Sequence, residues 1–102
     1  MATIGSFTVG KDGYTGTIRT LTVNMKASIV ANDRKKIERE PDFRIYAGRA
    51  ELGAAWKAKT GGDEPRDYLS VLLDDPSFPQ PIRAALFEED GAAFLVWNRR
   101  EG

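Results

Sequence analysis

The chain has 102 residues, the size of one domain with a modest core, and its 41% hydrophobic and 29% charged residues are typical of folded proteins. It contains no cysteine and no histidine, which excludes disulfides, thiol nucleophiles and the commonest zinc ligands. No apolar run is long enough to span a bilayer, and no signal peptide is recognisable. We therefore expect a single domain over residues 1–102, located in the cytoplasm and without contact to a membrane.

The formal net charge is zero, but the charges are unevenly distributed along the chain. Residues 1–59 contain eleven Lys and Arg against six Asp and Glu, whereas residues 60–102 contain four against nine. This asymmetry fits attraction between the two halves of one fold, head-to-tail contact between copies, or a basic face. Attraction within one fold is the simplest of the three interpretations.

The first third of the chain is typical of strands joined by short turns. Residues 4–18 contain two runs of β-branched and aromatic residues on either side of an Asp-Gly pair, a strong hairpin signal. Residues 21–29 alternate apolar and polar side chains, which predicts a strand with Leu21 on its buried face. Because Ile18 has the opposite parity, we predict a β-bulge or a bend near Arg19.

The middle of the chain contains its most polar stretch. Residues 30–42 are predicted to form a polar loop, and the basic run Arg34-Lys35-Lys36 within it could contact phosphates, although a solvated loop is the simpler interpretation. Residues 43–47 alternate again. The composition of residues 50–58 permits a helix or a strand. We choose a strand, because a Gly-rich loop leads from it straight back into residues 68–73 and completes a wide hairpin.

The strand predicted at residues 68–73 is apolar on both faces, which favours a central position in a sheet. Three prolines keep the segment after it out of a strand ladder until Ile82. Residues 82–87 and 93–97 then form a second hairpin around an Asp-Gly turn, and residues 98–102 are a polar tail. About seven short strands without a long helix predict an all-β fold, a single small antiparallel barrel or sandwich built from hairpins.

Residues 66–82 carry the run Arg-Asp-Tyr-Leu-Ser-Val-x-Leu-Asp-Asp-Pro-Ser-Phe-Pro-x-Pro-Ile, which resembles the bacterial family catalogued as domain of unknown function 736. Three further stretches agree with that family: Ala-Thr-Ile-Gly-x-Phe from residue 2, Gly-Thr-Ile-Arg-Thr-Leu from residue 16 and Gly-Ala-Ala-Trp-Lys from residue 53. The resemblance implies a small soluble bacterial protein, often encoded on plasmids or other mobile elements. It implies no particular activity.

The residue types offer little for catalysis. Asp74 and Asp75 could bind a divalent cation, but neighbouring strand residues point to opposite faces, and Asp before Pro commonly opens a turn. The hydroxyl groups of residues such as Ser70 and Thr15 have no histidine to activate them. We therefore predict that the protein is not an enzyme and uses no metal and no cofactor.

Aromatic and basic residues supply the binding hypotheses. A face of rings and cations on a small barrel could hold single-stranded nucleic acid, and its candidate members are Tyr14, Arg19, Arg44, Tyr46, Lys57 and Tyr68. Phe78, between prolines, would be an anchor for a protein partner or a plug for the end of the barrel. The remaining large rings are expected to fill the core: Phe7, Phe43, Trp56, Phe94 and Trp97.

Between these partners we prefer a protein or a second copy of the chain, because a net charge of zero weakens phosphate binding and exposed strand edges readily add strands from partners. The expected function is that of a non-enzymatic binding or accessory module, with binding to single-stranded nucleic acid as the alternative.

Overall fold

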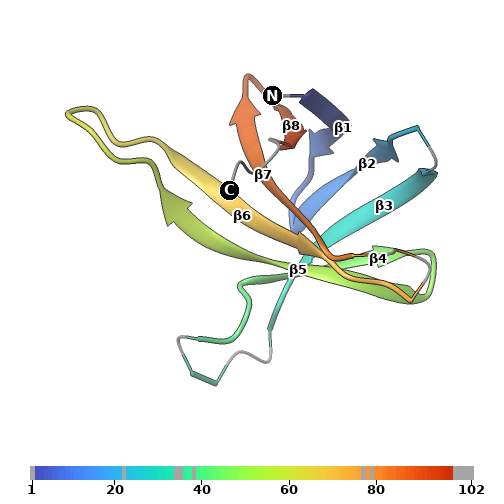
Figure 1. Cartoon of the computed structure of the whole chain (residues 1–102). Coiled ribbons are helices and arrows are strands. Elements are labelled where there is room, and N and C mark those ends of the chain that lie inside the picture. Colours follow the sequence, from blue (N-terminus) through green and yellow to red (C-terminus); the bar gives the residue numbers. More distant parts are fainter. Residues whose placement is uncertain are drawn as a thin grey trace.

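The computed structural model describes residues 2–21, 23–33, 36–37, 39–76, 78 and 80–97. These residues form eight antiparallel strands that close into a barrel, in which each strand pairs with its neighbours in the chain and β8 pairs with β1 (Figure 1). The strands are β1 (Ala2–Val9), β2 (Gly13–Arg19), β3 (Asn24–Ala31), β4 (Phe43–Ala47), β5 (Ala50–Lys59), β6 (Asp67–Leu73), β7 (Ile82–Glu89) and β8 (Ala92–Trp97). The predicted all-β class is confirmed, and the barrel is the form it takes. A closed barrel has no central strand, so β6 has two neighbours like every other strand.

The two hairpins with Asp-Gly turns form as predicted. Gly10 and Gly13 close the first turn, with the Gly10 N–H donating to the Gly13 carbonyl oxygen at 2.7 Å. In the second, Asp90 and Gly91 both have positive φ, at 52° and 82°, which is the geometry of the tight turn that matches the twist of hairpin strands. Glycine adopts this conformation without steric cost, and aspartate tolerates it better than most residues.

The chain reverses direction completely between β2 and β3, so the predicted bulge or bend near Arg19 was wrong. The Thr20 N–H donates to the Val23 carbonyl oxygen at 2.7 Å, and the Val23 N–H donates to the Thr20 hydroxyl oxygen at 3.1 Å. Leu21 lies in this turn and is fully exposed rather than buried. Leu21 and Ile18 do not fit one alternating pattern because Ile18 belongs to β2 and Leu21 belongs to the turn after it.

A β-bulge within β5 determines which of its side chains face the inside of the barrel. Ile45 of β4 pairs with Gly53, and the next residue, Tyr46, pairs with Glu51, so Leu52 is an extra residue in β5. Leu52 and Ala55 are both buried, at 3% and 0% exposure, although they are three positions apart. The choice of a strand for this segment was right, but Trp56, which was expected in the core, lies on the outside.

The inward-facing side chains of the eight strands fill the barrel, as expected for a barrel of this size. The largest side chains that are fully buried are Ile18, Ile29, Ile45, Leu73 and Leu95. No polar or charged residue is buried among the residues that the structure describes. The same residues include no helix long and apolar enough to cross a membrane.

One end of the barrel is covered by Phe78, from the segment after β6. The Phe78 side chain is half-buried and packs against the core, and the Phe78 N–H donates to the Asp75 carbonyl oxygen at 2.9 Å. The Asp74 N–H donates to the Leu52 carbonyl oxygen at 2.7 Å. The segment that begins at the two aspartates is therefore a turn, and Phe78 occupies the position of a plug.

The polar loop between β3 and β4 begins later than expected, because β3 extends to Ala31. Arg34 and Lys35 of its basic run, and the predicted tail at residues 98–102, lie outside the described residues. Lys36 is exposed, and its backbone N–H donates to a Glu40 carboxylate oxygen at 3.0 Å.

Candidate binding sites at the barrel mouth and on the outer wall

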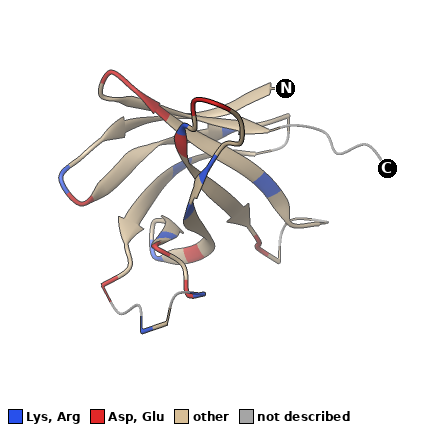
Figure 2. Cartoon of the chain, turned by 90° about the vertical axis from the view of Figure 1, so that its left-hand side faces the viewer, with Lys and Arg blue, Asp and Glu red and all other residues tan. Residues whose placement is uncertain are grey.

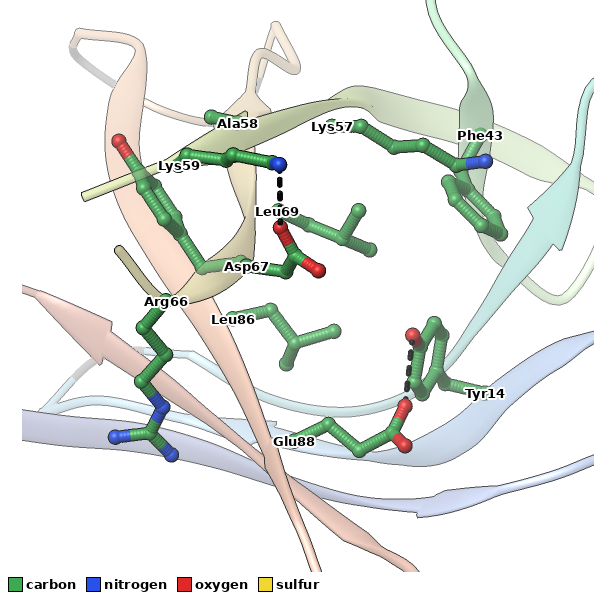
Figure 3. Close-up of a pocket in the computed structure, with 11 residues that line it drawn as sticks. Tyr14, Phe43, Lys57, Ala58, Lys59, Arg66, Asp67, Leu69, Leu86 and Glu88 are labelled. Atoms are coloured by element: carbon green, nitrogen blue, oxygen red, sulfur yellow. Dashed lines mark hydrogen bonds and ion pairs between the residues drawn. The ribbon is translucent and has the colours of Figure 1, made fainter. Parts of the chain in front are cut away.

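The end of the barrel opposite Phe78 opens into a cavity of about 710 Å³, which we call the mouth cavity (Figure 3). The strand register explains which side chains reach it. Lys57 pairs with Leu69, and Leu69 pairs with Leu86, so these three side chains project from the same inner face. The two leucines form an apolar floor, whereas Lys57 lies nearer the opening and is exposed.

Two polar pairs lie on either side of that floor (Figure 3). Lys59 Nζ lies 3.9 Å from Asp67 Oδ1, and the Tyr14 hydroxyl donates to Glu88 Oε1 at 3.2 Å. Each carboxylate of the cavity thus has a partner. Within the described part of the chain, the Lys57 ammonium group has no hydrogen bond or ion pair, and in Figure 3 it extends over the cavity toward Phe43.

The contact with Glu88 changes the acidity of Tyr14. Partial burial, the negative charge of Glu88 and the hydrogen bond donated to it all favour the neutral phenol, so the pKa of Tyr14 is raised above its ordinary value of 10.0. At neutral pH the hydroxyl therefore remains a donor. The stability that this contact contributes is present below pH 10 and is lost as the pH rises through the raised pKa.

We expect this shift to be visible in the ultraviolet titration of tyrosine. The component of the tyrosinate signal that is present in the wild type and absent from Tyr14→Phe should have its midpoint above pH 10, because partial burial and the charge of Glu88 both oppose ionisation of the phenol. In Glu88→Gln the same component should move to lower pH. A Tyr14 component centred at or below pH 10 in the wild type would contradict the contact.

A second candidate site is the outer surface of β5–β8, which we call the apolar wall. Its large outward-facing side chains are Trp56, Tyr68, Leu72, Phe87, Phe94 and Val96, with alanine or serine between them and the charged residues Arg83 and Glu89 at the two ends of β7. The outer surface of β1–β4 is mostly polar by contrast, with Val30 as an exposed apolar exception among Ser6, Thr15, Thr17, Lys26, Ser28 and Arg44. Two of the rings expected in the core, Trp56 and Phe94, belong to this wall.

Aromatic side chains on the wall are ordered by contacts with one another. The Tyr68 and Phe87 rings stack with centroids 5.3 Å apart and an interplanar angle of 23°, and the Arg66 guanidinium lies 5.1 Å from the Phe87 centroid. Phe94 pairs with Phe87 across β7 and β8 and is 40% exposed. The Trp56 indole N–H donates to the Arg39 carbonyl oxygen at 3.1 Å.

The structure does not gather the predicted binding residues on one face. Tyr14, Lys57 and Tyr68 all border the mouth cavity, although the Tyr68 side chain faces outward from β6 and stacks on Phe87. Arg44 and Tyr46 line a separate pocket of about 400 Å³ beside Glu51. Arg19 is exposed at the other end of the barrel.

Arg44 is less suited to phosphate binding than its sequence position suggested. Its Nη1 lies 2.7 Å from Glu51 Oε1, and this hydrogen bond and the Glu51 charge raise the pKa of Arg44. A phosphate would have to displace that carboxylate. Among the residues that the structure describes, the Lys and Arg positions of the first half of the chain are spread over several strands and loops (Figure 2).

Sequence reasoning missed Arg66, Phe87 and Phe94. The sequence contains part of the pattern that reveals an apolar outer surface, since residues 68–73 are apolar on both faces of their strand. The same pattern occurs in β7 and β8, where Ala85, Phe87, Phe94 and Val96 occupy outward positions. Phe94 was expected in the core because large apolar side chains are usually buried, and Phe87 was given no position.

Fold and sites together define a small up-and-down β-barrel with one plugged end, one open mouth and an apolar outer wall on half its circumference. The family model described as "Protein of unknown function (DUF736)" matches residues 3–100, so the chain belongs to this family. The resemblance found in the sequence is thereby confirmed. No curated protein and no solved structure matches the chain.

Proposed function

We propose that this chain is a non-enzymatic accessory module of the bacterial cytoplasm that binds a protein surface through its apolar wall. In the form that we favour, the bound surface is the same wall of a second copy. The plasmid association implied by the family resemblance fits an accessory role of this kind.

The observation that supports the proposal is the difference between the two halves of the outer surface. A strand exposed to water ordinarily alternates apolar and polar side chains, as β1–β4 do. The outer faces of β6–β8 instead carry Tyr68, Leu72, Phe87, Phe94 and Val96. Phe94 is exposed and the other four side chains are half-buried, so they form one largely apolar surface around it. Apolar surface of this kind marks interaction sites in soluble proteins. Aromatic rings are also enriched in protein interfaces.

A second copy fits the wall because the charges at its two ends are complementary. Arg83 and Glu89 both face outward from β7, one toward the plugged end and the other toward the mouth. In a twofold dimer each wall meets itself, so a residue at one end of the strand can meet its complement at the other end in the partner. Two antiparallel copies of β7 would therefore place Arg83 near Glu89 of the other copy.

We expect the wild-type chain to form dimers in sedimentation velocity, and Phe94→Glu to weaken them by at least about tenfold, because a carboxylate would be buried without a partner. Thr15→Glu is the matched control. It introduces the same charge at an exposed position on the polar half of the barrel and should leave the dimer unchanged.

Charge reversal tests the twofold arrangement itself. Arg83→Glu and Glu89→Arg should each weaken the dimer, and the double variant should restore it, since the two charges exchange places. A wild-type chain that stays monomeric at the highest attainable concentration contradicts self-association. If each single variant weakens the dimer and the double variant does not restore it, the antiparallel pairing of Arg83 with Glu89 is contradicted. The wall is then still the interface.

Binding of single-stranded nucleic acid is the second candidate, and one observation favours it. The stacked Tyr68 and Phe87 rings lie beside Arg66, and bases stack on such rings next to cations. In fluorescence anisotropy with a labelled single strand, this candidate requires affinity that falls steeply with salt and is lost in Tyr68→Ala. If the chain binds no single strand at low salt but forms a dimer that Phe94→Glu disrupts, protein binding is the function that remains.

A further inference from the structure

We propose that the mouth cavity binds one small amphipathic anion, with its apolar part on the Leu69 and Leu86 floor and its anionic head group at Lys57. This ligand site lies inside the barrel opening and goes beyond the association proposed for the outer wall.

The shape of the cavity suits a small ligand. Its volume of about 710 Å³ lies within the range of roughly 300–1,000 Å³ that is common for small-molecule sites, and the mouths of β-barrels are among the places where such sites occur. An eight-stranded barrel is just wide enough for its own side chains or for one small ligand. Here the plugged end is filled by side chains and the mouth is open.

The floor and one side of the cavity are apolar. Leu69 and Leu86 are 7% and 2% exposed, and together with the rings of Tyr14 and Phe43 they line the cavity. The two rings lie with centroids 6.0 Å apart at an angle of 58°, a favourable tilted arrangement. An alkyl or aryl group placed there would leave water on contact with side chains that are already ordered.

The pairing of the charged groups at the cavity favours an anion. Lys57, Lys59 and Arg66 line the cavity beside two carboxylates, Asp67 and Glu88. Asp67 is paired with Lys59, and Glu88 accepts the Tyr14 hydrogen bond. The Arg66 guanidinium lies over the Phe87 ring, outside the cavity. Lys57 is therefore the cation available to a head group, one strand away from the Leu69 floor.

We would titrate the ¹⁵N-labelled chain with octanoate, octanol and octylammonium, which share one apolar tail and differ in the charge of the head group. Octanoate should bind saturably at one site, shifting the amide signals of residues around the mouth such as Leu69 and Leu86. Octylammonium should bind at least about tenfold more weakly, a difference that corresponds to about 1.4 kcal/mol.

Lys57→Gln should reduce the affinity for octanoate by about tenfold and leave the affinity for octanol unchanged, because it removes the charge-assisted hydrogen bond and keeps the apolar floor. Lys11→Gln is the matched control. Lys11 is an exposed lysine in the turn between β1 and β2 at the same end of the barrel, but it does not line the cavity. Both variants change exposed positions, and their amide spectra report whether the fold is intact.

Equal affinity for octanoate and octylammonium, or an unchanged octanoate affinity in Lys57→Gln, would overturn the proposal. So would signal changes that centre on Phe94 and Val96, which would place the tail on the apolar wall. The two proposals fail separately. Phe94→Glu should leave octanoate binding intact, and Lys57→Gln should leave the dimer intact.

Discussion

Replacing Gly16 by alanine is expected to remove a large part of the stability of the barrel. Gly16 of β2 faces inward and pairs with Phe7 of β1. A Cβ atom at this position would lie 2.0 Å from the Ser6 carbonyl oxygen and 2.7 Å from the Phe7 Cα. Both are backbone atoms of β1, so no side-chain rotation can relieve the overlap. The two strands would have to separate.

The expected cost follows from the effects of overpacking. Extra atoms in a packed core ordinarily cost about 1–3 kcal/mol when side chains and backbone can shift. We expect about 3 kcal/mol or more here, because the obstacle is a strand that is paired on both sides. A small domain has only about 5–15 kcal/mol of stability in total, so this loss would lower its denaturation midpoint substantially.

Urea denaturation followed by tryptophan fluorescence measures this cost. Thr15→Ala, at the neighbouring exposed position of the same strand, is the control and should change the free energy of unfolding by no more than about 0.5 kcal/mol. If Gly16→Ala and Thr15→Ala have the same midpoint, β1 and β2 do not approach as closely at Gly16 as the structure shows.

The second large effect is a difference in the free energy of unfolding between substitutions at two adjacent residues of β8. Leu95 is 1% exposed and belongs to the core, whereas Phe94, the larger side chain, is 40% exposed on the apolar wall. We expect Leu95→Ala to reduce the free energy of unfolding by about 2–5 kcal/mol, the range for buried leucines that leave a cavity. Phe94→Ala should cost less than about 1 kcal/mol, since its side chain contacts water on one side.

Both variants should be unfolded at a protein concentration below that at which the wild type associates, because dimer formation would add to the apparent stability. At higher concentration Phe94→Ala should lose that added stability. A cost for Phe94→Ala that equals or exceeds that of Leu95→Ala at low concentration would show that β8 has the opposite face toward the core.

The candidate sites were only partly predictable from the sequence. Residue type alone pointed to Tyr14, Lys57 and Tyr68, and all three border the mouth cavity, Tyr68 from the outer face of β6. Their grouping with Arg19 and Arg44 was wrong as a single face, because these side chains lie at different ends or on different strands of the barrel. Chain order gives the order of the strands around this barrel, but the end and the face on which a side chain lies depend on the strand bounds and on the register between strands.

The sequence by itself determined the local features of this protein. Asp-Gly turns placed two hairpins, alternation within residues 43–47 placed the buried face of that strand, and the shared motifs of residues 66–82 indicated the family. Each of these depends on neighbouring residues, whose geometry is set by allowed backbone angles and the two-residue period of a strand.

Only the tertiary structure decided which face of each strand points into the barrel and which points outward. The bulge at Leu52 turned Trp56 outward, and the pairing of β8 with β1 closed the barrel and placed Phe94 on the wall. The mouth cavity likewise exists because Lys57, Leu69 and Leu86 pair across three strands. These features depend on hydrogen bonds between segments far apart in the chain. A shift of one residue in any of those ladders exchanges the inner and outer faces of a strand.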